Sequence, residues 1–101
     1  MATEKSVQKC LALLLCTEEE EEEEALRHYF RLLSRDSRAL SAQEIGELSS
    51  KVELAEEKCH HWDDETMFLA GRLLFELDRE YRRRMNDPRL WLELIASHRL
   101  T

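Results

Sequence analysis

Apolar residues recur along the chain at intervals of three and four, which is the spacing of one face of an α-helix. This spacing occurs in five segments, and short polar stretches separate them. We therefore predict five helices, over residues 3–16, 18–34, 42–59, 64–84 and from 88 to near the C-terminus. The chain has only two Gly and one Pro. An all-β protein of many short strands needs more turn residues than that.

Residues typical of helix starts precede four of the five segments. A Ser, Thr, Asp or Asn side chain at this place accepts a hydrogen bond from a free backbone N–H of the first turn, and a Glu three residues later completes a capping box. The predicted caps are Thr17 with Glu20, Ser41 with Glu44, Asp63 or Asp64, and Asn86 or Asp87 before Pro88. These caps support the predicted boundaries.

The segment 64–84 is the most apolar of the five. One stripe at helical spacing consists of Met67, Ala70, Leu74, Leu77 and Tyr81, and Phe68, Leu69, Leu73 and Phe75 cover much of the remaining circumference. A helix that is apolar nearly all round is normally buried by several neighbours. We therefore predict an all-α fold: a single domain over residues 1–101, a compact bundle of about five helices with the helix at 64–84 in its centre.

Seven consecutive glutamates, residues 18–24, open the second predicted helix. Acidic residues are favourable there because they meet the positive end of the helix dipole. The face that carries Leu26 and Phe30 further along has only glutamates in these first turns. We therefore predict an exposed, solvated acidic helix start at 18–24. A local disordered loop and a dedicated binding surface are the alternatives.

Composition and charge narrow the class of protein. Of the 101 residues, 43% are hydrophobic and 37% charged, and the net charge is −7. A negative chain lacks the positive charge that displaces counterions from nucleic acid, and no apolar run approaches the roughly 18–20 residues that span a membrane. Three cysteines, an odd number, without a convincing secretory signal argue against a disulfide framework. We expect a reducing compartment, cytoplasmic or nuclear.

Cys59, His60 and His61 are adjacent residues that can bind metals. Zinc sites usually combine two separated pairs of ligands, and the sequence has no second pair. Cys59 continues the apolar stripe of the third helix, so we interpret it as a core thiol beside two exposed imidazoles. A metal or redox sensor at these three residues is the alternative. No catalytic motif is visible, and we predict neither enzymatic activity nor a cofactor.

A cluster of arginines follows the most apolar stretch. Its members are Arg79, Arg82, Arg83, Arg84 and Arg89. Cations are favourable at the C-terminal end of a helix, and these residues could also face the glutamate run. An acidic protein partner and a nucleic acid are the two alternative targets. Trp62, in the junction before residue 64, is expected to be partly exposed and to anchor an interface.

Apolar helical stripes without a visible reactive group indicate a function in binding. We predict a non-catalytic protein–protein interaction module, such as a small adaptor, regulatory subunit or assembly domain. Its partner would be another protein or a second copy, bound through apolar helix faces and the arginine cluster with Trp62. A nucleic-acid-associated protein that uses Arg79–Arg89 is the first alternative function. The sensor at Cys59, His60 and His61 is the second.

Overall fold

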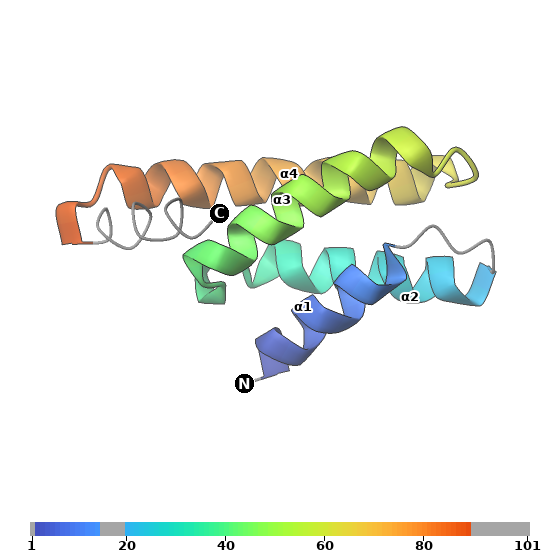
Figure 1. Cartoon of the computed structure of the whole chain (residues 1–101), viewed down its shortest axis with the longest axis horizontal. Helices are drawn as coiled ribbons and strands as arrows, with labels where there is room; N and C mark the ends of the chain where they lie inside the picture. Colours follow the sequence, from blue (N-terminus) through green and yellow to red (C-terminus); the bar gives the residue numbers. More distant parts are fainter. Residues whose placement is uncertain (1, 15–19, 90–101) are drawn as a thin grey trace.

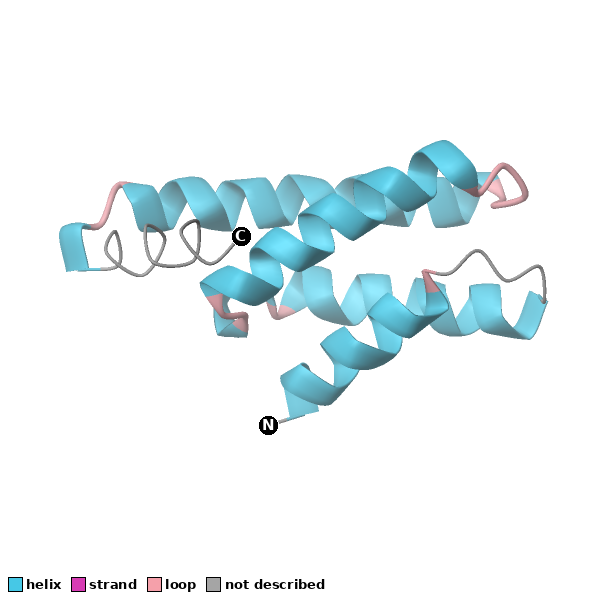
Figure 2. Ribbon diagram, in the orientation of Figure 1, coloured by secondary structure: helices cyan, strands magenta, loops and turns pink. Residues whose placement is uncertain are grey.

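The computed structural model describes residues 2–14 and 20–89, and this part of the chain contains helices and no strand. Four α-helices and one short 3₁₀ helix follow one another along the chain (Figures 1 and 2). They are α1 (Ala2–Leu13), α2 (Glu20–Arg35), η1 (Ser37–Ala39), α3 (Ala42–Lys58) and α4 (Asp64–Met85). The predicted all-α class is confirmed. The predicted fifth helix lies outside the described residues, except for its first two, Pro88 and Arg89.

The helices form two layers. In Figure 1, α2 and α4 run along the long axis of the molecule, and α1 and α3 cross in front of them. The contacts agree with this view, because α2 packs on α4, α1 on α2, and α3 on α4. The molecule is elongated, with extents of 43 × 24 × 20 Å.

The core lies between the two layers and receives side chains from every α-helix. The fully buried residues of largest volume include Phe30 and Leu26 from α2, Leu48 from α3 and Leu73 from α4. Phe30 packs edge-on against Trp62, with 5.9 Å between ring centroids. Trp62 is only 8% exposed, so the expectation that it is partly exposed is wrong. Three-and-four spacing predicts burial only within a helix, and Trp62 lies in the loop between α3 and α4.

Cys10 of α1 is a free cysteine and is buried in the core. Burial raises the pKa of its thiol to about 12. Since the thiolate is the reactive form, the Cys10 sulfur stays protonated at neutral pH and acts as a small apolar group of the core.

Two predicted caps are confirmed. The Ser41 hydroxyl accepts a hydrogen bond from the Glu44 backbone N–H at 3.1 Å, and the Glu44 carboxylate accepts one from the Ser41 backbone N–H at 2.8 Å. Asp63 caps α4 by accepting a bond from the Thr66 backbone N–H at 2.8 Å. The Thr17 cap lies outside the described residues.

Among the described residues, helix α4 is covered on one side only. Its buried face, which includes Leu73 and Leu77, packs between α2 and α3. The opposite face carries Phe68 and Phe75, which are 67% and 65% exposed. The predicted central helix thus has several neighbours, α2, α3 and η1, but none of the described elements covers Phe68 and Phe75.

Candidate protein-contact surface on α4

The N-terminal end of α4 is held by an acidic side chain from α2. One carboxylate oxygen of Glu23, Oε1, accepts hydrogen bonds from the backbone N–H of Asp63 at 2.9 Å and from the hydroxyl of Thr66 at 2.8 Å. Arg27 lies in the same cluster and donates to the Thr66 hydroxyl at 3.1 Å. A carboxylate at this place is favourable because the free N–H groups of a helix start are positively polarised.

The glutamates of the run thus differ in their exposure to solvent. Glu21 and Glu24 are exposed, whereas Glu22 and Glu23 are half-buried. Because Glu23 joins α2 to α4, the prediction of a uniformly exposed acidic start does not hold for that residue. The side chains of residues 18–20 lie outside the described part of the chain.

The C-terminal end of α4 is fixed by a buried ion pair. The Glu80 carboxylate accepts a hydrogen bond from Arg84 Nε at 3.1 Å, and both side chains are buried. Arg84 Nη2 donates to the backbone carbonyls of Leu40 and Arg38, in the connector between α2 and α3. Arg83 approaches the same carboxylate, with 2.7 Å from Nη2 to Oε2. The cluster therefore ties the end of α4 to the connector.

Glu80 makes the stability of this end depend on pH. Burial alone raises the pKa of its carboxyl group, but hydrogen bonds and charges from Arg83 and Arg84 outweigh burial, so the pKa is below its ordinary value. The folded state then binds the Glu80 proton more weakly than the unfolded chain does. Its contribution to stability is present above the unfolded pKa and is lost as the pH falls through the folded one.

We expect this effect in the comparison of wild type with Glu80→Gln. Urea titrations at pH 7 should show a lower free energy of unfolding for the variant, because glutamine carries no charge for the two arginines. At pH 3 the difference between the two proteins should be smaller, because the unfolded wild-type chain binds the Glu80 proton more readily than the folded state does. A difference that is equal at both pH values would contradict the assignment.

The residues of the arginine cluster differ in their exposure and in their ion-pair partners. Arg84 is 5% exposed and belongs to the buried pair. Arg82 is exposed and pairs with Asp78, at 3.0 Å from Nε to Oδ2. Arg89 is exposed and pairs with Asp87. Arg79 is exposed and has no ion-pair partner among the described residues. Arg83 stays half-exposed beside Glu80. The cluster is therefore not one continuous cationic surface.

The face of α4 opposite the core forms a different surface, which we call the outward face of α4. Its members are Asp64, Phe68, Gly71, Arg72, Phe75, Arg79 and Arg82, all of them exposed. Phe68 and Phe75 are seven residues apart, which is about two helical turns, and their side chains therefore lie in line. Arg72 lies beside this line and has no ion-pair partner in the described part of the chain.

The sequence contained a signal for this surface. Phe68 and Phe75 fall opposite Leu73 and Leu77 on a helix of 3.6 residues per turn. A helix that is apolar on two opposite sides needs a neighbour on each side, and a chain of 101 residues supplies few helices for that purpose. The predicted binding through apolar helix faces rests on this excess of apolar surface, but the excess alone does not say which residues stay uncovered.

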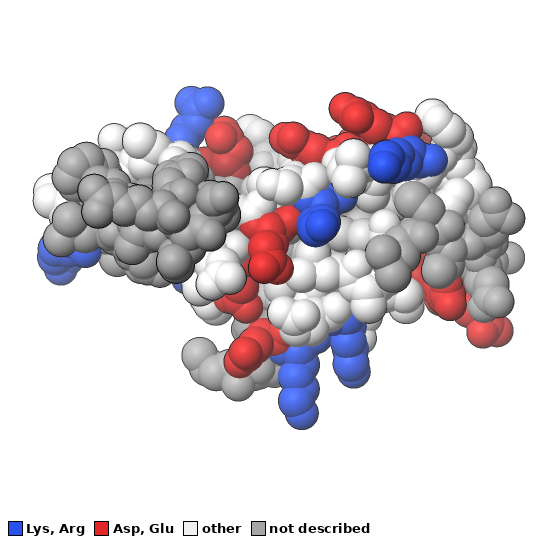
Figure 3. Space-filling model, viewed as in Figure 1, with Lys and Arg blue, Asp and Glu red and all other residues white. Residues whose placement is uncertain are grey.

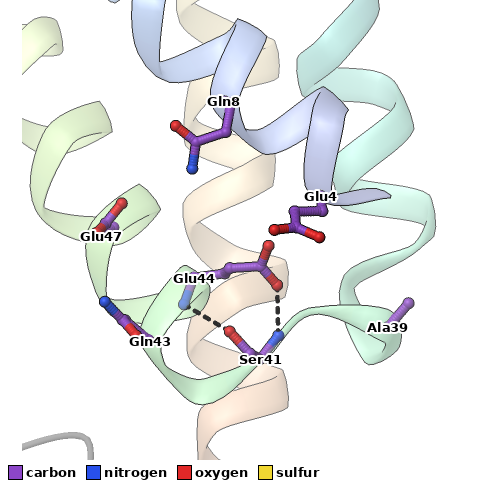
Figure 4. A pocket seen from close by; sticks show the side chains of 7 residues that line it. All are labelled: Glu4, Gln8, Ala39, Ser41, Gln43, Glu44 and Glu47. Atoms are coloured by element: carbon purple, nitrogen blue, oxygen red, sulfur yellow. Dashed lines mark hydrogen bonds between the residues drawn. The ribbon is translucent and has the colours of Figure 1, made fainter. Parts of the chain in front are cut away.

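A hollow of about 400 Å³ lies between α1 and the start of α3 (Figure 4). It is lined by Glu4, Gln8, Ala39, Ser41, Gln43, Glu44 and Glu47. Ser41 and Glu44 are already bonded to each other as the cap of α3. On the side of the molecule seen in Figure 3, acidic and basic side chains are interspersed.

Cys59 differs from its predicted state. It is buried as expected, but it takes part in a disulfide bond, so the interpretation as a free core thiol is wrong. His60 and His61 are exposed. No group of three His, Cys, Asp or Glu side chains suited to a metal ion occurs in the described part of the chain. Disulfides are typical of oxidising compartments, and the assignment to a reducing one stays a prediction.

Comparison with known proteins adds no relationship: no family model, curated protein or solved structure matches the chain. Among the described residues, no helix is long and apolar enough to cross a membrane.

Proposed function

We propose that the protein is a non-catalytic protein-contact module that acts through the outward face of α4. The observation that carries this proposal is the exposure of Phe68 and Phe75 in line on one helix face. Burying a phenylalanine is worth roughly 1.5–3 kcal/mol. Isolated exposed apolar residues are ordinary, but two large ones on the same face form a patch that suits a partner.

The neighbours of the two phenylalanines fit the same function. Arg72 and Arg79 flank them without ion-pair partners among the described residues. Aromatic residues and arginine supply much of the binding energy in protein interfaces. Trp62 and Arg84 were expected from the sequence to bind a partner. Both are buried in the fold, and we leave them out of the proposed surface.

A photo-crosslinking experiment tests this function. Benzoylphenylalanine replaces Phe75 in one variant and Leu54 in another, because Leu54 is a 44% exposed apolar residue on α3 and gives a matched control. Each variant is irradiated as purified protein and in native cell extract. We expect covalent protein adducts from position 75, few from position 54, and loss of the adducts at position 75 on Phe68→Ser.

Two other outcomes of the crosslinking experiment would contradict the proposal, each in a different way. Absence of adducts from position 75 in both samples would refute the contact function of this face. Equal yields from positions 54 and 75 would show that exposure alone, and not this surface, determines the adducts. The nucleic-acid alternative stays a prediction, and binding to a labelled oligonucleotide over a salt titration tests it separately.

A further inference from the structure

The outward face of α4 has matching residues at equal distances on either side of a midpoint between Gly71 and Arg72. Phe68 and Phe75 lie at the same distance from this midpoint, and Asp64 and Arg79 lie four residues further out on either side. A copy of the helix that runs in the opposite direction therefore places Phe68 against Phe75 and Asp64 against Arg79. A two-fold axis repeats each of these contacts.

We propose that the outward face of α4 binds the same face of a second copy of this chain, antiparallel and centred between Gly71 and Arg72. This inference rests on the contact function proposed above and names the partner. Each phenylalanine would lose its exposed surface to a phenylalanine of the other copy, and each end of the interface would hold one pair of opposite charges.

Charge complementarity supports a second copy as the partner. Asp64 and Arg79 are both exposed, and neither forms an ion pair within residues 2–14 and 20–89. Two chains that each carry a net charge of −7 repel at long range, so association needs local pairing of opposite charges. The antiparallel arrangement brings two Asp64–Arg79 pairs together and leaves no uncompensated charge at either end of the phenylalanine contacts.

The position of Gly71 is a second observation that supports the antiparallel helix pair. A glycine within a helix costs stability relative to alanine. An added Cβ at this position would meet nothing within 4 Å, so the fold of a single copy makes no use of the missing side chain. At the centre of a helix pair, however, glycine lets two backbones approach closely. Packed helices lie about 8–10 Å apart, and the side chains at the contact set the distance.

Arg72 is the one charged residue close to the proposed axis, where the Arg72 side chains of the two copies would approach each other. It also lines a hollow between α2 and α4, together with Leu69 and Glu76. This hollow lies to one side of the phenylalanine line, toward α2. The Arg72 side chain can therefore remain beside the interface, where water and Glu76 screen the two like charges.

The expected affinity is modest. One pair of helices buries less surface than the roughly 800 Å² per partner of a standard interface. We therefore expect a dissociation constant on the order of 10–100 µM. Sedimentation velocity of the purified chain, from about 5 to about 500 µM, should show a shift from monomer to dimer.

Exchange of charges gives the sharpest test. In Asp64→Arg, positions 64 and 79 both carry arginine, and in Arg79→Asp both carry aspartate. Each variant alone would therefore place like charges against each other at both ends of its dimer. We expect each to dimerise at least about tenfold more weakly than wild type. An equimolar mixture of the two variants restores both opposite-charge pairs and should form a heterodimer about as well as wild type self-associates. A merely misfolded variant would not regain association in the mixture, and circular dichroism checks the helix content of each.

A matched pair of glycine variants tests the centre of the interface. Gly71→Gln should keep or raise the melting temperature and abolish the dimer. Gly46→Gln, the same substitution on α3, also enters open space and should leave the dimer unchanged. Loss of association in both variants, or in neither, would overturn the proposed centre.

The outcomes also separate this inference from the proposed function. A wild-type chain that stays monomeric up to 500 µM, or a mixture of the charge variants that fails to associate, overturns the second copy as partner. If position 75 still crosslinks to a different protein in extract, the contact function stands with another occupant. If position 75 forms no adduct at all, both proposals fail.

Discussion

Replacement of Phe30 by alanine is expected to lower the free energy of unfolding by about 4 kcal/mol. Phe30 is fully buried between the two helix layers and lies edge-on against Trp62. The loss combines the apolar area removed from the core with a cavity that the neighbouring side chains fill only in part. Because domains of this size have a free energy of unfolding of roughly 5–15 kcal/mol, the Phe30 ring accounts for a large part of the stability of the fold.

Urea unfolding followed by far-ultraviolet circular dichroism measures this change. Phe75→Ala is the matched control, because it removes the same atoms from a side chain that is 65% exposed. The control should change stability by no more than about 0.5 kcal/mol. Equal losses for Phe30→Ala and Phe75→Ala would contradict both the position of the core and the assignment of the outward face.

Replacement of Arg84 by alanine is expected to cost about 3 kcal/mol of stability, because removal of one partner from a buried ion pair leaves the other poorly compensated. Glu80 would keep only Arg83, which is half-exposed. The carbonyls of Arg38 and Leu40 would also lose their guanidinium donor. The loss should therefore weaken the attachment of α4 to the connector before α3.

The matched control is Arg82→Ala, two residues away on the same helix. Arg82 forms an exposed pair with Asp78, and such pairs contribute about 0–1 kcal/mol. Hydrogen exchange should show faster exchange in the connector for Arg84→Ala than for Arg82→Ala. If the two variants are equally stable, the buried pair does not hold this end of α4.

The helices and two of their caps followed from the sequence because both depend on local spacing. The stripe of α3, for example, is buried from Ile45 to Ala55, and Ser41 and Glu44 form the predicted capping box. Such features need only the residues within one or two turns. The fifth predicted helix lies mainly outside the described residues.

The contacts between distant residues did not follow from the sequence. Glu23 reaches Asp63 across forty positions, and Arg84 reaches Leu40 across forty-four. No spacing rule distinguishes these two side chains from the other glutamates and arginines around them. The exposure of Phe68 and Phe75 depends likewise on which helices pack on α4, so it was known only from the arrangement in space.

Most of the candidate surface was likewise not predicted. The sequence indicated binding through an arginine cluster, of which Arg79 and Arg82 lie on the outward face of α4. Arg84 and Trp62 belong to the interior instead. Arginine is a frequent interface residue, but it also serves buried ion pairs, and composition alone does not separate these two uses.

The most direct test of the central claim, that the outward face of α4 is the contact surface, is a nuclear magnetic resonance dilution series on the ¹⁵N-labelled chain. The account predicts concentration-dependent shifts of backbone amides from Asp64 to Arg82, largest around Phe68, Gly71 and Phe75, and their loss in Gly71→Gln. Shifts confined to α1 or α3, or a spectrum that does not change with concentration while position 75 also forms no crosslink, would contradict it.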